Sequence, residues 1–342
     1  MSHSPHRPRN WPAKAARVGE LLPLTRLHPA ALERAKRSRA SEPWCVALSG
    51  GVDSVALLLL LWAHWPERRE RMVALHFNHR LRGRAAEADA KFCSRVCAAL
   101  GIRLVTGAWN AKSRQGASEA AARAARQAFF ARSMKRRNAR LLWLAHQQDD
   151  IAETQLMRLA RGSGTAGLAA PRPVHATGGD GGVRLRPLLT VKKAELCAVL
   201  LAAGATWRED QTNAGRRFFR NRVRQTVLPA WVDVSGRDAL AGAALSRERL
   251  EEDDAALEAW LDELAPLRRG RLDLTILADK PVAIWRRALH RWLLAVKPES
   301  DLSRQGFDVL LGVARRGGST RFSLGKEAFA IIRRGKLAFK RD

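Results

Sequence analysis

A glycine pair followed by an acid interrupts an apolar stretch of the chain. The string Ser49-Gly50-Gly51-Val52-Asp53-Ser54 lies between the apolar residues 45–48 and 55–62. Glycines at the end of a strand leave backbone N–H groups bare, and the N-terminus of a following helix adds positive potential, so the string predicts a phosphate site. An acid inside such a site is expected to hold Mg²⁺ against the phosphates, and we assign this role to Asp53. A plain strand-to-helix turn with Asp53 as capping residue is the alternative, but it does not explain the whole string.

A second group of polar residues precedes and opens a predicted helix at residues 149–159. His146 stands just before this helix, and the acids Asp150 and Glu153 lie three residues apart, so they share one helix face. A carboxylate pair suits a substrate ammonium group and could accept a proton from an amine. An N-terminal helix acid, a surface ion pair and a hydrogen-bonding histidine at a strand end are the alternatives.

The elements that must position these residues alternate between strand and helix. Strands are predicted at residues 44–48, 72–77, 102–106 and 141–145, and helices at residues 55–63, 85–100, 118–136 and 149–159. This order predicts an α/β fold with a doubly wound parallel sheet, Rossmann-like, with helices on both faces. Ligands bind beyond the carboxyl ends of such strands, which places residues 49–54, 76–82 and 146–150 along one rim.

Four segments are expected along the chain. We predict a basic, largely disordered extension at residues 1–40, a catalytic domain at 41–229, a helical linker at 230–268 and a small α+β domain at 269–342. The catalytic domain ends in a strongly basic helix at residues 216–227.

The charge balance indicates a polyanionic partner. The 342 residues include 61 Lys and Arg against 33 Asp and Glu, a formal net charge of +28. This excess favours nucleic acid over a membrane surface, because no basic amphipathic helix stands apart and no apolar run reaches membrane-spanning length. The four cysteines form no Cys-x-x-Cys pair, so we expect reduced thiols and a cytoplasmic protein.

Two other nucleotide motifs are excluded. No G-x-x-x-x-G-K-[ST] string occurs, which disfavours a P-loop kinase or GTPase. Residues 162–167 match G-x-G-x-x-G, but they follow a predicted helix instead of a strand, which argues against dinucleotide binding.

The string at residues 49–54 resembles the PP-loop of the ATP-pyrophosphatase superfamily, and further strings narrow the resemblance to the tRNA(Ile)-lysidine synthetase family. These strings are HFNHRLR (76–82), SEAAARAARQAFF (118–130), LAHQQDDIAET (144–154), RGSGTAGLA (161–169), RPLL (186–189) and WREDQTNAGRRFFRNRVR (207–224). Two departures stand out: Gln147 replaces a second histidine that is usual in the family, and Gln211 replaces a usual Asp or Pro.

The resemblance implies a reaction and its participants. Members of the family use ATP and Mg²⁺ to adenylate the wobble cytidine of an isoleucine tRNA with anticodon CAU, and free L-lysine then displaces AMP. The residues expected to bind the nucleotide are Ser49, Gly50, Gly51, Val52, Asp53, Ser54, His76 and Asn78. Substrate is expected at Arg82, Glu119, Arg123, Asp150 and Glu153, catalysis at Asp53, His146, Asp150 and Glu153, and tRNA at Arg216, Arg217, Arg220 and Arg224.

Two rival functions stay open. A PP-loop tRNA thiolation enzyme needs a sulfur-carrying cysteine or a cluster near the cleft, whereas Cys45 lies in a strand and Cys93 and Cys97 on a helix. A non-catalytic RNA-binding relative would not need the acids Asp53, Asp150 and Glu153. We expect neither a DNA nor a membrane partner, and the sequence leaves a homodimer open.

Overall fold

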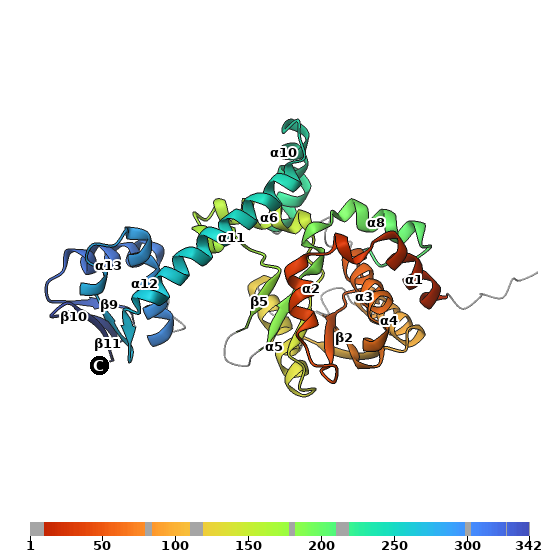
Figure 1. The fold of residues 1–342 in the computed structure, drawn as a ribbon, viewed down its shortest axis with the longest axis horizontal. Coiled ribbons are helices and arrows are strands. Elements are labelled where there is room, and N and C mark those ends of the chain that lie inside the picture. The colour runs from red at the N-terminus through yellow and green to blue at the C-terminus, as the bar shows by residue number, and fades with distance from the viewer. Residues whose placement is uncertain are drawn as a thin grey trace, which may run out of the picture. The chain divides into compact units, whose positions relative to one another are not determined.

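The computed structural model divides the chain into two compact units, Met1–Arg249 and Leu250–Asp342 (Figure 1). It describes residues 10–78, 84–109, 119–177, 182–209, 219–297, 302–325 and 327–341. None of the described helices combines the length and the hydropathy of a membrane-spanning segment.

The first unit is built on a six-stranded sheet, which confirms the predicted α/β class. Five of its strands are parallel: β1 (Trp44–Ala47), β2 (Met72–Asn78), β3 (Arg103–Ala108), β4 (Leu141–Trp143) and β6 (Val183–Leu185). The strand order is β3-β2-β1-β4-β6-β5, and β5 (Val174–Ala176) runs antiparallel at the edge. Strands β5 and β6 were not predicted, because their three residues, VHA and VRL, do not form an apolar run like the LLW of β4.

Alternating side chains of the parallel strands enter two separate cores. Trp44 and Val46 of β1 belong to one core, and Cys45 to the other. The first core is covered by α1 (Trp11–Leu21), α2 (Pro29–Lys36), α3 (Val52–His64), α4 (Arg84–Ala99) and α8 (Lys193–Ala202). The second is covered by α5 (Glu119–Lys135) through Phe129 and Phe130. The sheet is therefore wound on both faces, as predicted.

Residues 11–36 differ from the predicted disordered extension. Trp11, Ala15 and Val18 recur at helical spacing on α1 and are at most 3% exposed. The Asn10 side chain caps this helix by accepting a hydrogen bond from the Ala13 amide at 3.1 Å. The basic composition obscured this apolar stripe, through which α1 packs against α3, α4 and α8, while Ala31 and Ala35 of α2 are buried in the same core. Residues 1–9 lie outside the described part of the chain.

A third group of helices packs beside the sheet around Ile151, Ala152, Leu189, Leu228 and Ala243. It comprises α6 (Gln148–Leu159), α10 (Leu228–Val234) and the start of α11 (Ala239–Leu264).

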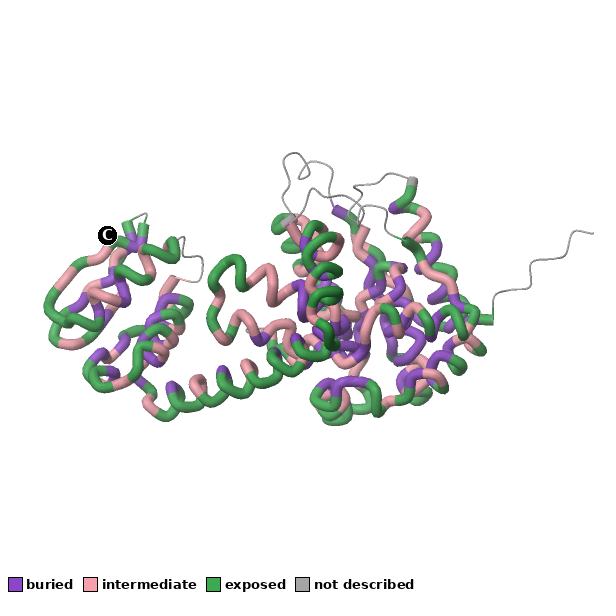
Figure 2. The backbone as a smooth tube through the Cα atoms, turned by 90° about the horizontal axis from the view of Figure 1, so that it is seen from above, coloured by how far each residue is buried: buried purple, intermediate pink, exposed green. Residues whose placement is uncertain are grey.

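The short α7 (Thr165–Leu168) follows α6, and α9 (Phe219–Arg222) continues into a π-helical turn, Val223–Val227. Single 3₁₀ turns cover Leu24–Arg26, Pro66–Arg71, Pro187–Thr190 and Thr275–Leu277. Buried positions alternate with exposed ones along α11 (Figure 2).

The second unit is a small α+β structure, in agreement with the predicted class. Its antiparallel sheet has the order β7-β8-β11-β10-β9. The strands are β7 (Leu267–Arg268), β8 (Arg271–Asp273), β9 (Thr320–Ser323), β10 (Ala328–Arg333) and β11 (Lys336–Arg341), and the helices are α12 (Val282–Val296) and α13 (Arg304–Arg316). Trp285, Trp292 and Leu310 fill its core. The division between the units falls inside α11, so the predicted linker is not a separate segment.

Candidate active site

The PP-loop string forms the turn between β1 and α3, and Ser54 holds that turn together. The Ser54 hydroxyl oxygen accepts hydrogen bonds from the amides of Ser49 (3.1 Å) and Gly50 (3.2 Å), and donates to the Gly51 carbonyl at 3.0 Å. Gly51 is the N-cap residue of α3, and no side chain caps this helix. The first N–H groups of a 13-residue helix therefore have no capping side chain and suit an anion.

Gly50 is required by both its conformation and its neighbours. Its φ is +94°, a region that L-residues with a side chain rarely adopt, and an added Cβ would lie 3.3 Å from the Cys93 sulfur. The Gly50 carbonyl accepts a hydrogen bond from the Arg208 amide at 2.8 Å, and Arg208 in turn pairs with Asp89 at 2.9 Å. Arg208, which sequence reasoning missed, thus fixes the outer side of the turn.

Asp53 fits the predicted role of a cation ligand. Its Oδ1 atom is buried and has no hydrogen-bond partner among the described residues. The pKa of Asp53 is raised to about 7, first by burial and then by the negative charge of Asp150, while the positive charges of Lys193 and Arg224 oppose this rise. A buried carboxylate oxygen with no partner beside a phosphate-type turn would be compensated by a bound Mg²⁺, which takes one or two carboxylates together with phosphate oxygens and water.

His76 supports the turn from the neighbouring strand β2, whereas Asn78, at the end of the same strand, contacts α4. The His76 Nδ1–H donates to the Leu48 carbonyl at 2.9 Å, and burial lowers the pKa of this ring. The His76 Nε2 atom is buried without a partner in the described ranges. The Asn78 side-chain amide donates to the Ala86 carbonyl at 3.2 Å. Nucleotide binding by these two residues stays a prediction.

Helix α6 opens with a reciprocal cap that accounts for the first departure from the family pattern. The Gln147 side chain accepts from the Asp149 amide at 2.6 Å, and the Asp150 carboxylate accepts from the Gln147 amide at 3.0 Å. Gln147 is 1% exposed, so its role is to fix the start of the helix. The spacing Gln-x-x-Asp carried this signal in the sequence.

The acid pair on α6 is already occupied by two arginines. Arg220 pairs with Asp150 at 2.5 Å and with Glu153 at 2.8 Å, and Arg224 pairs with Glu153 at 2.5 Å. Asp150 and Glu153 are 6% and 1% exposed. The arginines come from α9 and the π-helical turn, where a register change presents both to α6. The structure therefore brings together two pairs that were predicted separately, one for lysine and one for tRNA. Contact of Arg220 and Arg224 with tRNA stays a prediction.

His146 lies at the end of β4 among positive charges. Its Nδ1 atom accepts a hydrogen bond from the Arg186 Nε–H at 3.2 Å. Burial lowers the pKa of His146 well below its ordinary value, and Arg186, Arg220, Arg126 and Arg123 lower it further. The charge of Arg123 thus acts on His146, while its predicted contact with substrate stays a prediction. Arg82, Arg216 and Arg217 lie outside the described residues, as does the side chain of Glu119.

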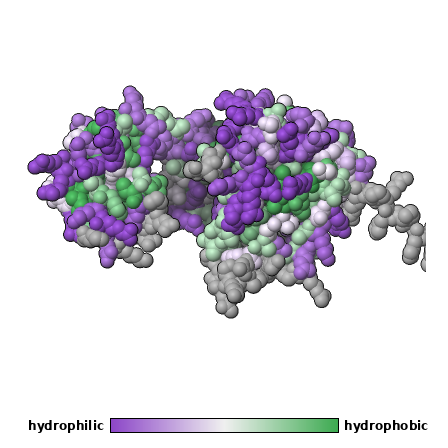
Figure 3. Space-filling model, turned by 90° about the horizontal axis from the view of Figure 1, so that it is seen from below, coloured by the Kyte–Doolittle hydropathy of each residue, from purple (hydrophilic) through white to green (hydrophobic). Residues whose placement is uncertain are grey.

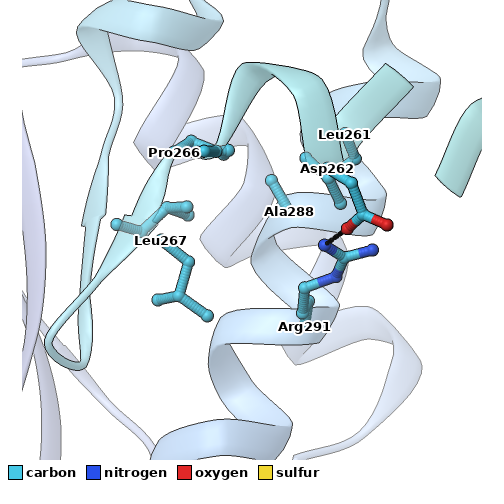
Figure 4. Close-up of a pocket in the computed structure, with 8 residues that line it drawn as sticks. Leu261, Asp262, Pro266, Leu267, Ala288 and Arg291 are labelled. Atoms are coloured by element: carbon cyan, nitrogen blue, oxygen red, sulfur yellow. Dashed lines mark hydrogen bonds and ion pairs between the residues drawn. The ribbon is translucent and has the colours of Figure 1, made fainter. Parts of the chain in front are cut away.

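A cavity in the second unit has fewer polar and charged side chains than this rim. This cavity, of about 220 Å³, is lined by Leu261, Pro266, Leu267 and Ala288, with a single ion pair between Asp262 and Arg291 (Figure 4). Hydrophilic side chains occupy much of the visible surface of both units (Figure 3). We therefore place the candidate active site at the carboxyl ends of β1, β2 and β4.

Comparisons with known proteins show what the chain is similar to. The chain is 34% identical to a tRNA(Ile)-lysidine synthase of Geobacter sulfurreducens over 86% of its own length, and 39% identical to one of Rhodopseudomonas palustris over 66%. It spans 64% of the length of each of these relatives. The U34-tRNA thiolase NcsA of Methanococcus maripaludis has the same fold, with a TM-score of 0.52 and 18% identity over 70% of this chain and 78% of its own.

The predicted resemblance to tRNA(Ile)-lysidine synthetases is confirmed by these curated relatives. The family model described as PP-loop domain matches residues 26–231, which include α2 and every described residue of the candidate site. The matched range begins before the predicted boundary at residue 41, consistent with the burial of α2. By this match, the chain belongs to the PP-loop family.

Proposed function

We propose that this chain is a tRNA(Ile)-lysidine synthase, which joins free L-lysine to C2 of the wobble cytidine in isoleucine tRNA with anticodon CAU. The observation that carries the proposal is the similarity to curated enzymes of that name over the whole candidate site. The rim supplies the chemistry that the reaction needs: a phosphate-type turn, an acid with one buried oxygen that has no hydrogen-bond partner in the described ranges, and a buried acid pair.

The first step is adenylation of the tRNA. The cytidine O2 attacks the α-phosphorus of ATP, the bond to the bridging oxygen breaks, and pyrophosphate leaves. The turn at residues 49–54 and the first N–H groups of α3 would bind the pyrophosphate end. Asp53 would hold Mg²⁺, which supplies charge neutralisation on the leaving group. No proton needs to leave the attacking oxygen, because it attacks as a carbonyl oxygen.

The second step consumes lysine. Its ε-amine attacks C2, the bond from C2 to oxygen breaks, and AMP leaves. We assign recognition of the lysine ammonium group to Asp150 and Glu153 and propose this pair as the acceptor of the proton that the amine loses. All four carboxylate oxygens of the pair have partners in the structure. Lysine must therefore share or replace a bond made by Arg220 or Arg224.

The net charge of +28 supports a tRNA partner. We propose that phosphate contacts come from Arg216, Arg217, Arg220 and Arg224 and from the second unit, and that the enzyme works in the cytoplasm with ATP and Mg²⁺. We propose no DNA or membrane partner, and a homodimer stays open.

The thiol chemistry argues against the rival thiolation reaction. Burial raises the pKa of Cys45, Cys93 and Cys97 to about 12, so these thiols are protonated at neutral pH. Among the residues the structure describes, no group of three His, Cys, Asp or Glu side chains is placed to hold a metal. Cys45, Cys93 and Cys97 are therefore poorly suited to carry sulfur or to hold a cluster.

The decisive experiment measures incorporation of labelled lysine into an isoleucine tRNA transcript with anticodon CAU, with ATP and Mg²⁺. We expect label that depends on ATP and is lost in Asp53→Asn, and no label in a methionine tRNA transcript with the same anticodon. AMP formation without label would indicate another nucleophile. If neither label nor AMP forms, the chain is a binding protein and the proposal is wrong.

A further inference from the structure

Arg186, from the RPLL string, has a guanidinium group that is held on two sides. It directly follows β6 and is 8% exposed. Its Nη1 donates to the Arg172 carbonyl at 2.7 Å, and its Nε donates to the His146 ring at 3.2 Å. Burial, together with Arg184 and Arg123, lowers the pKa of Arg186 to about 10, so the group still carries its charge at neutral pH.

This contact determines where the imidazole proton of His146 lies. An arginine Nε always carries a hydrogen and cannot accept a hydrogen bond. The His146 Nδ1 atom must therefore be the acceptor and carries no proton. In a neutral imidazole the proton then lies on Nε2.

The surroundings keep the ring neutral. Arg186 donates to the ring directly, and the positive charges of Arg220 on α9 and of Arg123 and Arg126 on α5 lower the pKa of His146 further. Protonation would place a second hydrogen on Nδ1, directly against the Arg186 N–H. His146 therefore presents an Nε2–H donor and no basic nitrogen, which excludes a general-base role.

The position of His146 indicates which oxygen accepts a hydrogen bond from its Nε2–H. His146 lies three residues beyond β4, the strand next to β1, whose turn would bind pyrophosphate, and it precedes the acid pair that would bind lysine. In the proposed reaction, the α-phosphoryl group is bonded to pyrophosphate before the first step and to the cytidine that lysine attacks after it. It is therefore the part of the nucleotide expected between the two sites. The surrounding positive charges favour an anionic oxygen over a neutral one.

We propose that Arg186 is a positioning residue that fixes His146 as an Nε2–H donor to an anionic oxygen of the α-phosphoryl group. The identity of that group rests on the proposed function. The protonation state of the ring does not, because it follows from the contact between Arg186 and His146 alone.

The first test measures AMP formation by variants at residue 146. A glutamine amide nitrogen can occupy the place of Nε2, whereas an asparagine amide reaches only the place of Nδ1. We expect His146→Gln to lose less than about tenfold in kcat, and His146→Asn and His146→Ala to lose roughly 10²–10³-fold, the usual effect of one such donor. The KM for tRNA should stay unchanged. A glutamine variant as inactive as the alanine variant would overturn the donor role.

The second test needs no activity. In the free enzyme labelled with ¹⁵N-histidine, the His146 ring should show the Nε2–H tautomer between about pH 5.5 and 8.5. Arg186→Met should populate both tautomers and move the pKa toward its ordinary value, and a merely structural arginine would leave the tautomer unchanged. Arg184→Met removes the same charge two residues away and should preserve the Nε2–H tautomer.

The two tests separate the proposals. An Nδ1–H tautomer in the wild-type enzyme would refute the positioning role, whatever the activity. A wild-type enzyme that forms no AMP would refute the proposed function and the α-phosphoryl assignment, while the tautomer is still measured in the free protein.

Discussion

Replacing Asp53 by asparagine should stabilise the folded protein at alkaline pH while abolishing AMP formation. The carboxyl group has a buried oxygen without a partner, and its pKa is raised from 3.8 to about 7 by burial and by Asp150. A raised carboxyl pKa means that the folded state holds its proton longer than the unfolded state. Its ionisation therefore costs stability, and this cost grows as the pH rises from about 4 through 7.

The size of the effect follows from the two pKa values. A shift from 3.8 to about 7 corresponds to an upper limit of roughly 4 kcal/mol well above pH 7, at 1.36 kcal/mol per unit. Between pH 5 and pH 8, the same values give a change of roughly 2–3 kcal/mol. Partial hydration of the half-buried side chain reduces this figure, so we expect Asp53→Asn to gain about 1–2 kcal/mol relative to wild type over that range.

The assay is urea unfolding of wild type and Asp53→Asn at pH 5 and pH 8, without nucleotide or Mg²⁺. Asp233→Asn is the matched control, because Asp233 is exposed in the same unit and should show no pH-dependent gain. A variant that is equally destabilised at both pH values would refute the reasoning, since Asp53 would then have a structural hydrogen-bonding role. A variant that gains stability and still forms AMP would refute its role as the Mg²⁺ ligand.

Three further predictions concern the acid–arginine group and the turn. Glu153→Gln leaves two arginines without a full partner, so it should lower the free energy of unfolding, measured in urea, by about 3 kcal/mol. The same variant should lose lysine-dependent turnover. Gly50→Ala forces a side chain into φ +94°, so it should lower the free energy of unfolding by roughly 1–2 kcal/mol and abolish AMP formation. Gly101→Ala is the control: its φ is +67° with open space around it, so it should lose similar stability and keep activity. Ser54→Ala removes the acceptor of two turn amides and should cost about 2 kcal/mol and raise the KM for ATP; an unchanged KM would show that the turn does not bind nucleotide.

The sequence predicted the first unit's strand-and-helix order because its periodicity is strong. Helix α3 is apolar through nearly its whole length, and β1, β2 and β4 are short apolar runs that end in polar residues. The carboxyl ends of parallel strands must meet at one edge, so the rim followed from topology alone. Helices α1 and α2 were missed because their apolar residues are widely spaced among basic ones.

The pairing within the site could not be read from the sequence. Arg220 and Glu153 are far apart along the chain, and their contact depends on how α9 packs against α6. Composition gives the number of arginines but does not say which ones face acids and which face solvent. The role of Arg186 was hidden for the same reason, since its partner His146 lies on another strand.

The charges at the rim suit a reaction in which two substrates of opposite charge bind in turn. ATP carries negative charge and lysine carries positive charge, yet both must reach one cytidine. At Asp53, where a cation would accompany phosphate, one buried carboxylate oxygen has no hydrogen-bond partner among the described residues, whereas Asp150 and Glu153 are paired with arginines. Because the second pair is neutralised by arginine, it adds little repulsion toward an approaching nucleotide. Lysine that shares or replaces one of these arginine bonds then brings one further positive charge to the same carboxylates. Removing the arginines without the acids should therefore weaken nucleotide binding more than lysine binding, an order that a purely RNA-contacting role for Arg220 and Arg224 does not predict.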